Sequence, residues 1–391
     1  MEEIARELEP LGRDLEEAKA FVEKLNKNLK DAEAMLGGSL AMGTNMKDKH
    51  DADIFVRYNE KGNLSDRLET TLKELKQKYQ RIHGSRDYFQ IENKITYEVV
   101  PVLKVNTAEE AETVVDMSPL HVEYFNNKAK QNTRKDVRLA KALCKAKGIY
   151  GAESHIQGFS GHVLNILTLY YGSFKELLEK ATNWKDKTII DIERKHKDPL
   201  MELDKAKTQG PLIVVDPVQD YRNAAAAVSK EAFQEFKKTA KEFLKKPSKE
   251  HFQKRPLKPK PGSIMIKLKP LNEKEDIAGS KILKIKQYIE RKLKENDFEI
   301  KWSDWEYGEE ANIAIQSKPI EKEKTIQGPP LEFKEHVEEF KSKYKDTYEN
   351  NGKIYAKTKR KHTKPEALIK ELLKDEYVKE RCKTAKDKIY K

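Results

Sequence analysis

The spacing of apolar residues changes several times along the chain, and each change marks a predicted element. In the first 35 residues, apolar side chains such as Phe21 and Leu25 recur every three or four positions, which predicts a helix ending near Gly37. Later runs rich in β-branched and aromatic residues predict strands. We expect a strand at 53–58, a helix at 65–82, and strands at 88–92 and 95–105. Together these elements predict a small α/β unit with a mixed sheet.

The middle of the chain, from 120 to 181, keeps a helical apolar period. Gly148 and Gly172 fall where two of these helices should stop, because glycine readily adopts the left-handed conformation that ends many helices. The elements expected in and after this region are helices at 134–147, 158–171 and 229–244 and a buried strand at 212–215.

A segment rich in lysine and proline at 253–262, QKRPLKPKPG, predicts an extended linker and a domain boundary. A second small α/β unit is expected beyond it, followed by a helical stretch with a hairpin. The expected elements are strands at 263–268, 298–305 and 311–316, helices at 277–295, 331–344 and 364–373, and a hairpin at 352–357.

Positive charge is concentrated after this linker. Of a net charge of +12, residues 1–250 contribute +2 and residues 251–391 contribute +10. A localised basic surplus of this kind favours a polyanionic partner such as nucleic acid, because binding releases counterions. The alternative is a solvated, lysine-rich surface.

The composition also bears on location. No apolar run approaches the roughly 18 residues that cross a bilayer, and the first residues form an acidic helical stretch rather than a signal peptide. Cys144 and Cys382 lie far apart, so neither a disulfide frame nor a zinc site is expected from the cysteines. We therefore expect a cytoplasmic protein with no membrane partner.

Residues 37–56, GGSLAMGTNMKDKHDADIFV, place a tight turn ahead of two aspartates at the start of a strand. Side chains two apart on a strand share a face, so Asp51 and Asp53 can address one cation. Oxygen ligands alone suit Mg²⁺. Gly38 and Ser39 offer backbone N–H groups and a hydroxyl to a triphosphate. This combination predicts two-metal nucleotidyl transfer.

A third carboxylate is expected from a neighbouring strand. Glu98, in KITYEVVPVLKV, precedes two valines that anchor the strand, so its side chain can project from the sheet. For any single acidic residue here, a solvated strand end is the alternative. The pair, the Gly-Ser turn and the later carboxylate together favour the metal site.

Gly-Ser followed by Asp-x-Asp resembles the polymerase-β-like nucleotidyltransferase superfamily. Further motifs narrow the likeness to the archaeal-type, class I CCA-adding enzymes (tRNA nucleotidyltransferases), strongly from about 35 to 250 and weakly beyond. In chain order these motifs are TVVDMSPLHVEYF, DVRLAKALCKAKGIYGAESHIQGFSGHVLNIL, YYGSF, NWKDKTIIDI and IVVDPVQDYRNAAAAVS.

The resemblance implies an α+β multidomain fold. It assigns a polymerase-β-like catalytic head to 1–115 and a helical neck that binds nucleotide to 116–252. A small α/β body follows at 253–330 and a tRNA-binding tail at 331–391.

The resemblance further implies template-independent addition and repair of the 3′-terminal CCA of tRNA from CTP and ATP, with release of pyrophosphate. Asp51, Asp53 and Glu98 are then the catalytic residues and the ligands of two Mg²⁺ ions. The family positions that touch the triphosphate, the ribose or the base fall on Gly38, Ser39, Ser118, His121, Lys141, Tyr150, Arg222 and Asn223. Arg222 and Asn223 match the base-reading position.

The basic last third is expected to grip the acceptor stem and T-arm of tRNA through backbone shape. Lysines at 281–294 and 357–364 are the expected phosphate contacts. The resemblance also allows a homodimer.

The chain departs from the family pattern at three positions. Met42 and Met117 stand where the family usually has arginine, and Glu98 stands where it has aspartate. The alternatives are an enzyme that adds only C or only A, a poly(A) polymerase of the same superfamily, and a catalytically weakened tRNA-binding relative.

Overall fold

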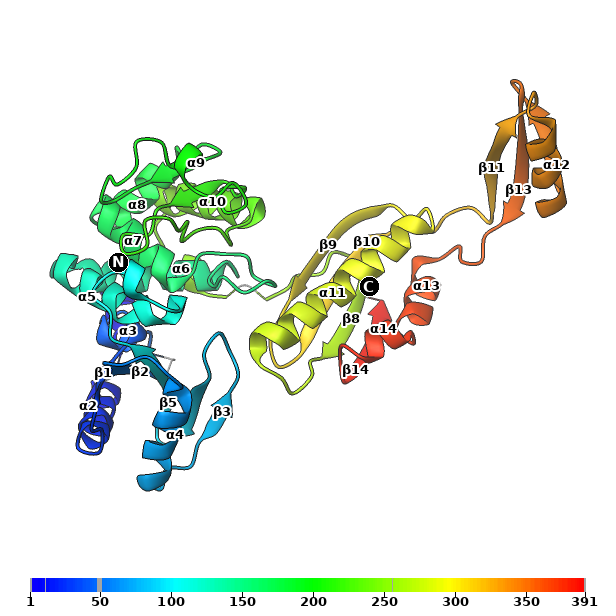
Figure 1. Ribbon diagram of the computed structural model, residues 1–391. Coiled ribbons are helices and arrows are strands. Elements are labelled where there is room, and N and C mark those ends of the chain that lie inside the picture. Colours follow the sequence, from blue (N-terminus) through cyan, green and yellow to red (C-terminus); the bar gives the residue numbers. More distant parts are fainter. Residues whose placement is uncertain (1, 11, 48–50, 255, 390–391) are drawn as a thin grey trace. The chain divides into compact units, whose positions relative to one another are not determined.

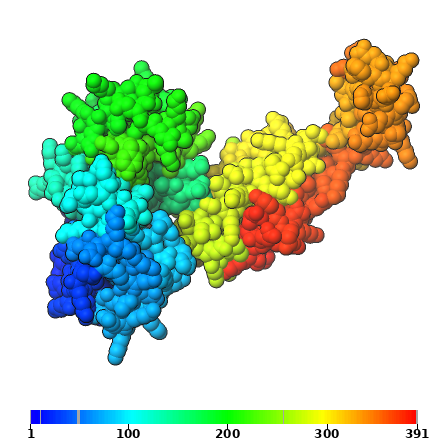
Figure 2. Space-filling model, in the orientation of Figure 1, coloured from blue at the N-terminus to red at the C-terminus, as the bar shows by residue number. Residues whose placement is uncertain are grey.

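A computed structural model describes residues 2–10, 12–47, 51–254 and 256–389. The chain divides into two compact units, Met1–Arg255 and Pro256–Lys391. The first unit runs from blue to green in Figures 1 and 2, and the second from yellow-green to red. Each unit has its own sheets and its own apolar packing.

The sheet that carries the predicted carboxylates has five strands in the order β1-β2-β5-β4-β3. Only β2 and β5 pair in parallel, and the other neighbours are antiparallel, so the predicted mixed sheet is confirmed. The strands are β1 Ala32–Leu36, β2 Asp51–Tyr58, β3 Gln80–Ile82, β4 Tyr88–Glu92 and β5 Thr96–Leu103.

One face of this sheet is covered by α2 (Arg13–Asn26) and α4 (Leu64–Glu74). Apolar side chains at alternate positions of the strands, such as Ile54 and Val99, are buried in this core. The intervening positions face the other side, because successive side chains of a strand point in opposite directions. The predicted carboxylates lie on that second face.

Two of the sequence predictions for this unit are wrong. The first 35 residues form two helices, α1 (Glu2–Glu7) and α2, followed by β1 rather than one continuous helix. The amide of Asn26, the last residue of α2, bonds the backbone N–H and C=O of Ala34, at 2.7 and 2.9 Å, which fixes β1 beside the helix end. The helix expected at 65–82 stops early, since Lys76 has a positive φ of 50° and the chain then forms β3.

Helices make up most of the remainder of the first unit and enclose a separate core. The predicted stop at Gly172 is confirmed, with φ at 88°, and the predicted helix before it begins at Gly161 because the Ser160 hydroxyl caps it. The elements are α5 Ser118–Lys128, α6 Thr133–Ala146, α7 Gly161–Tyr171, α8 Phe174–Ala181, α9 Pro199–Glu202, α10 Lys230–Lys245, β6 Thr188–Ile190, β7 Leu212–Val214, and 3₁₀ turns at 108–110, 114–117 and 249–252.

The second unit contains a four-stranded sheet of order β14-β8-β10-β9 and a three-stranded sheet of order β11-β13-β12. Its apolar core lies between the four-stranded sheet and the helices α11 and α13. The elements are β8 Ile264–Lys269, α11 Glu275–Glu295, β9 Ile300–Glu306, β10 Ala311–Ser317, β11 Glu323–Pro330, α12 Lys334–Lys343, β12 Thr347–Asn350, β13 Lys353–Lys359, α13 Pro365–Leu372, α14 Glu376–Lys379 and β14 Thr384–Ile389. Strands β11 and β14 were not among the predicted elements.

In the part of the chain that the structure describes, no helix combines the length and the apolar character needed to span a membrane.

Candidate active site

Asp53 and Glu98 lie side by side on the two parallel strands at the centre of the sheet. They are direct partners in the β2–β5 register, so their side chains leave the sheet on the same face. Asp51 precedes Asp53 by two positions and shares that face. All three are half-buried, whereas the alternate residues Ala52 and Val99 are fully buried. The structure therefore brings the three predicted carboxylates to one end of one sheet face.

The predicted phosphate turn, which contains Gly38, lies against the carboxylate of Asp53. Gly38 has a left-handed backbone, with φ at 55°, and a Cβ atom there would lie 1.6 Å from Oδ2 of Asp53. The N–H of Gly37 also donates to the backbone oxygen of Asp53 at 2.7 Å. The turn leads into the short helix α3 (Gly38–Ala41), which includes Ser39. Only glycine fits at position 38, because it has no Cβ and tolerates this φ.

Three basic residues of α6 hold the loop that follows this turn. Arg134 donates from Nε to the backbone oxygen of Met42 at 3.0 Å, and Arg138 donates to that of Gly43 at 2.7 Å. Lys141 donates to the backbone oxygen and the hydroxyl of Thr44, at 2.9 and 3.0 Å. Positions i, i+4 and i+7 share one face of a helix, so α6 presents a row of positive charge to this loop.

The predicted nucleotide-binding residues Lys141 and Tyr150 meet at the start of α7. A Cβ atom on Gly161 would lie 3.2 Å from the hydroxyl of Tyr150 and 3.6 Å from Nζ of Lys141. Lys141 is only 2% exposed, so it is a buried cation rather than a solvated helix lysine. Lys141 therefore connects two parts of the site: it lies beside Gly161 at the start of α7 and bonds Thr44 in the loop after the phosphate turn.

A second cluster forms around Asp216, just after β7. Its carboxylate accepts hydrogen bonds from Nε2 of His121 at 2.9 and 3.1 Å and from Nε2 of His162 at 3.0 Å. It also accepts one from NH1 of Arg222 at 3.1 Å. The carboxylate also accepts the backbone N–H of Val218 at 3.0 Å, and Asp216 is fully buried. The predicted residues His121 and Arg222 are therefore held by one shared anchor.

The electrostatics of this cluster favour an ionised carboxylate. Burial alone would raise the pKa of Asp216, but the hydrogen bonds from His121 and His162 and the charges nearby lower it well below its ordinary value. Burial lowers the pKa of His162, and the nearby charges of His121 and Arg222 lower it further. The hydrogen bond to Asp216 has the opposite effect but does not outweigh them.

The two base-reading candidates have different surroundings. The side chain of Arg222 is 41% exposed, and its guanidinium is directed by Asp216. The amide of Asn223 is buried and bonds four backbone groups, namely the N–H groups of Val214 and Ala225 and the oxygens of Lys207 and Leu212. In this conformation Asn223 fixes the turn that carries Arg222.

The two methionines that depart from the family pattern are each in contact with a side-chain amide. The sulfur of Met42 lies 3.3 Å from Nδ2 of Asn165 on α7, and that of Met117 lies 3.1 Å from Nε2 of Gln219. Met117 is 2% exposed and directly precedes Ser118, the first residue of α5. Both positions therefore join the loops of the site to other elements.

Sequence reasoning missed several residues of the site, among them Arg134, Arg138, His162 and Asp216. The position of Arg138 one turn and of Arg134 two turns ahead of Lys141 is a sequence signal that could have indicated them. No comparable signal exists for His162, whose partner Asp216 lies 54 positions away.

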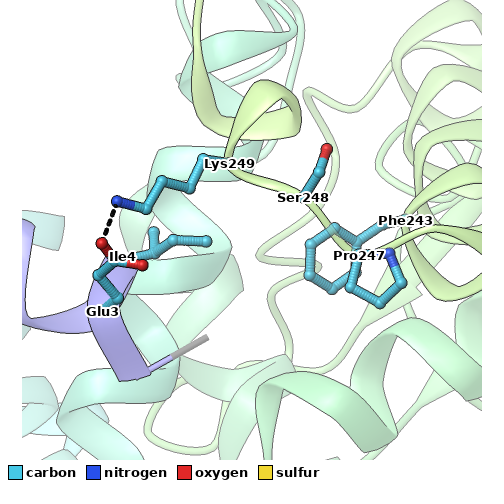
Figure 3. A pocket seen from close by; sticks show the side chains of 6 residues that line it. All are labelled: Glu3, Ile4, Phe243, Pro247, Ser248 and Lys249. Carbon is cyan, nitrogen blue, oxygen red and sulfur yellow. Dashed lines mark ion pairs between the residues drawn. The ribbon is translucent and has the colours of Figure 1, made fainter.

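The structure also has a small hollow of about 170 Å³ between α1 and the segment after α10. Figure 3 shows its lining, in which Lys249 forms an ion pair with Glu3 at 2.7 Å. None of the predicted site residues lines it: the lining residues are Glu3, Ile4, Phe243, Pro247, Ser248 and Lys249.

Paired carboxylates beside a glycine turn suit the transfer of a nucleotide. Comparison with known structures agrees with this at the level of the fold. The chain is similar to a cytoplasmic RNA terminal U-transferase, with a TM-score of 0.51 and 14% identity over 65% of this chain and 97% of that one. A nucleotidyltransferase domain family model matches residues 15–114. The protein is a polymerase-β-like nucleotidyltransferase.

Two further family models and the sequence relatives narrow the class. The models are the tRNA nucleotidyltransferase second domain, over residues 135–253, and the CCA-adding enzyme C-terminal domain, over residues 264–385. The CCA-adding enzyme of Saccharolobus shibatae is 31% identical over 94% of this chain and 90% of its own length. That of Nanoarchaeum equitans is 35% identical over 74% of this chain and 76% of its own length. The chain belongs to the family of archaeal CCA-adding enzymes.

Proposed function

We propose that this protein adds the terminal C, C and A to the 3′ end of tRNA, using CTP and ATP without a nucleic-acid template and releasing pyrophosphate. The observation that carries the proposal is the pairing of Asp53 with Glu98 on parallel strands beside the Gly38 turn. Membership of the CCA-adding family supplies the reaction class.

In this proposal Asp51, Asp53 and Glu98 hold two divalent cations, with Mg²⁺ as the expected metal. The donor set fits such ions, because it offers only carboxylate oxygens from one sheet face. When bound, the ions lower the pKa of the ribose 3′-hydroxyl and stabilise the charge of the departing pyrophosphate.

The chain's own groups orient the nucleotide. Gly38 and Ser39 present backbone N–H groups to the triphosphate, and Lys141 contributes a fixed positive charge. Ser118, His121 and Tyr150 donate hydrogen bonds to phosphate and ribose oxygens. No covalent intermediate with the enzyme is needed.

Base selection falls to Arg222 in this proposal, with Asn223 acting through the backbone it fixes. Adenine and cytosine both present an exocyclic amine beside a ring nitrogen acceptor. The guanidinium of Arg222 carries only N–H donors, so it can donate to this ring nitrogen in either base, whereas the corresponding ring nitrogen of uracil or guanine carries a hydrogen and cannot accept. The exocyclic amine is a donor and needs an acceptor from another group.

The tRNA is held by the second unit. We propose that the chain is divided into a head at 1–115, a neck at 116–252, a body at 253–330 and a tail at 331–391. Exposed lysines there, including Lys357 and Lys359 on β13, are the proposed phosphate contacts to the acceptor stem and T-arm. We also propose a cytoplasmic location and leave a homodimer to be tested by sedimentation.

The decisive experiment is a gel assay with Mg²⁺ and tRNA transcripts that lack CCA, CA or only A. We expect ordered addition of C, C and A followed by arrest. Asp53→Asn should reduce incorporation by about a thousandfold or more while tRNA still binds, because it removes a metal-ligand charge. Asp186→Asn, at an exposed position of the same unit, is the matched control.

Three other outcomes would contradict the proposal. Addition of only C or only A would indicate a partial enzyme, and a long A tail would indicate a poly(A) polymerase. Binding of tRNA without incorporation would indicate a protein that has lost catalysis.

A further inference from the structure

His121, His162 and Asp216 bring three potential metal-ligand atoms together in the first unit. The imidazole and carboxylate ligand atoms all lie within 4.8 Å of one another. Nε2 of His121 and Nε2 of His162 are 2.9 and 3.0 Å from oxygens of Asp216. Two metal ligands at about 2 Å from a tetrahedral ion are separated by little more than this, so small side-chain movements suffice to enclose an ion.

The three ligands are carried by different elements that hold them in place. His121 lies on α5, His162 on α7 and Asp216 in the turn after β7. The imidazole rings are 4.4 Å apart between centroids and pack edge to face. Backbone N–H groups of Val218 and Gln219 bond Oδ1 of Asp216, at 3.0 and 3.1 Å, and this oxygen also lies 2.9 Å from Nε2 of His121. Oδ2 faces both histidines, at 3.0 Å from Nε2 of His162 and 3.1 Å from that of His121.

We propose that His121, His162 and Asp216 form a binding site for one divalent transition-metal ion, of which Zn²⁺ is the best match. Two imidazole nitrogens and one carboxylate oxygen are the ligand set that such ions prefer, whereas Mg²⁺ prefers oxygen ligands alone. The site is therefore separate in chemistry from the carboxylates on β2 and β5.

The ion replaces the hydrogen atoms in the two hydrogen bonds between the Nε2 atoms of the histidines and Asp216. Each neutral imidazole turns its Nε2 lone pair to the metal and carries its proton on Nδ1. His162 is 27% exposed at its side chain, so solvent can reach the ion and supply the fourth ligand.

Metal binding competes with Arg222 for the same oxygen. NH1 of Arg222 is 3.1 Å from Oδ2 of Asp216, and the side chain is exposed enough to swing away. Like charges repel, so the ion displaces the guanidinium. If Arg222 reads the base, which rests on the proposed function, then Zn²⁺ inhibits nucleotide addition through this site.

The binding test needs neither tRNA nor nucleotide, so it is independent of the proposed function. Zn²⁺ is titrated into the full chain carrying Asp51→Asn, Asp53→Asn and Glu98→Gln, which removes all three sheet carboxylates. We expect one ion per chain, and His162→Phe should weaken its binding at least about tenfold. His196→Phe is the matched control, because His196 pairs with a single carboxylate, that of Glu202, at 2.8 Å.

Anomalous scattering from zinc in crystals of the unsubstituted chain gives a second measurement that does not depend on how the variants fold. A peak at about 2.0–2.1 Å from both Nε2 atoms is expected. Equal affinity in the His162→Phe chain, or zinc found only at other residues, would overturn the proposal.

The effect on activity is measured separately, as the ratio of incorporation with and without Zn²⁺ in each chain. The ratio should fall in the unsubstituted chain and change less in His162→Phe. Equal inhibition of both chains would contradict the competition with Arg222. The metal site itself is decided by the titration and by the anomalous scattering.

Discussion

Oδ2 of Asp53 lies 1.6 Å from the position that a Cβ atom on Gly38 would occupy. The turn and the carboxylate therefore fit each other only if residue 38 has no side chain. This close approach joins the element proposed to hold the triphosphate to the element proposed to hold the metal.

Gly38→Ala should reduce nucleotide incorporation at least about a hundredfold, because either the turn or Asp53 must move away. A stability loss of about 1–3 kcal/mol is also expected, since alanine is strained at a φ of 55°. Steady-state incorporation and urea unfolding measure the two effects. Gly148→Ala is the control, because Gly148 has a φ of 69° with no atom within 4 Å of a Cβ, so it should lose stability but keep activity.

Arg222→Ala should lower kcat/KM for CTP and for ATP alike, by about 10- to 100-fold, which corresponds to the loss of hydrogen bonds from a charged group. Misincorporation of UTP relative to CTP should increase. Arg194→Ala, which changes an exposed arginine in the same unit, should leave both quantities unchanged. A loss of rate with unchanged discrimination would mean that Arg222 does not read the base.

Asp116→Ala should destabilise the first unit by about 3–5 kcal/mol, because it leaves Arg86, whose side chain is only 10% exposed, with no ion pair except the longer one to Glu112 at 3.8 Å. The carboxylate of Asp116 is fully buried and also accepts the backbone N–H of Leu103 at 2.7 Å. Chemical denaturation measures the loss. Glu16→Ala removes an exposed ion pair with Lys19 and should cost no more than about 0.5 kcal/mol.

The same carboxylate predicts a pH dependence of stability. Burial would raise the pKa of Asp116, but the ion pair and backbone hydrogen bonds lower it below its ordinary value of 3.8. Its contribution is therefore fully present above that value and is lost as the pH falls through the lowered pKa. The difference in unfolding free energy between the unsubstituted chain and Asp116→Asn should shrink in acid below about pH 3.8. A difference that stays constant there would contradict the lowered pKa.

Reversing the charge of Lys357 and Lys359 to glutamate should weaken tRNA binding about equally for all tRNAs. Both side chains are exposed on one face of β13. The slope of log affinity against log salt should fall by about one unit for each phosphate that the variant no longer neutralises. Lys175→Glu, in the first unit, makes the same change in charge per residue and should have a smaller effect.

Local pattern predicted the elements on which the catalytic proposal depends. The strand at Asp53, the neighbouring strand of Glu98 and the glycine turn are all present, because short runs of β-branched residues and a Gly-Gly pair specify them locally. Strand β1 was misread, since the apolar positions of AEAML continue the helical spacing before it and its pairing with β2 is a tertiary effect.

The Asp216 cluster could not be predicted in the same way. His121 lies 95 positions and His162 54 positions from Asp216, and no local spacing relates them. Only the packing of α5 and α7 against the turn after β7 brings them together. The resemblance to a family indicated His121 and Arg222 but not the carboxylate that holds both.

Strand β14 pairs with β8 in antiparallel register, from Thr384 opposite Lys269 to Ile389 opposite Ile264. During synthesis β8 leaves the ribosome long before its partner exists, so one of its hydrogen-bonding edges must wait uncovered. Uncovered edges recruit other strands, and pairings between distant segments form slowly. The second unit therefore needs protection from aggregation until β14 has been made.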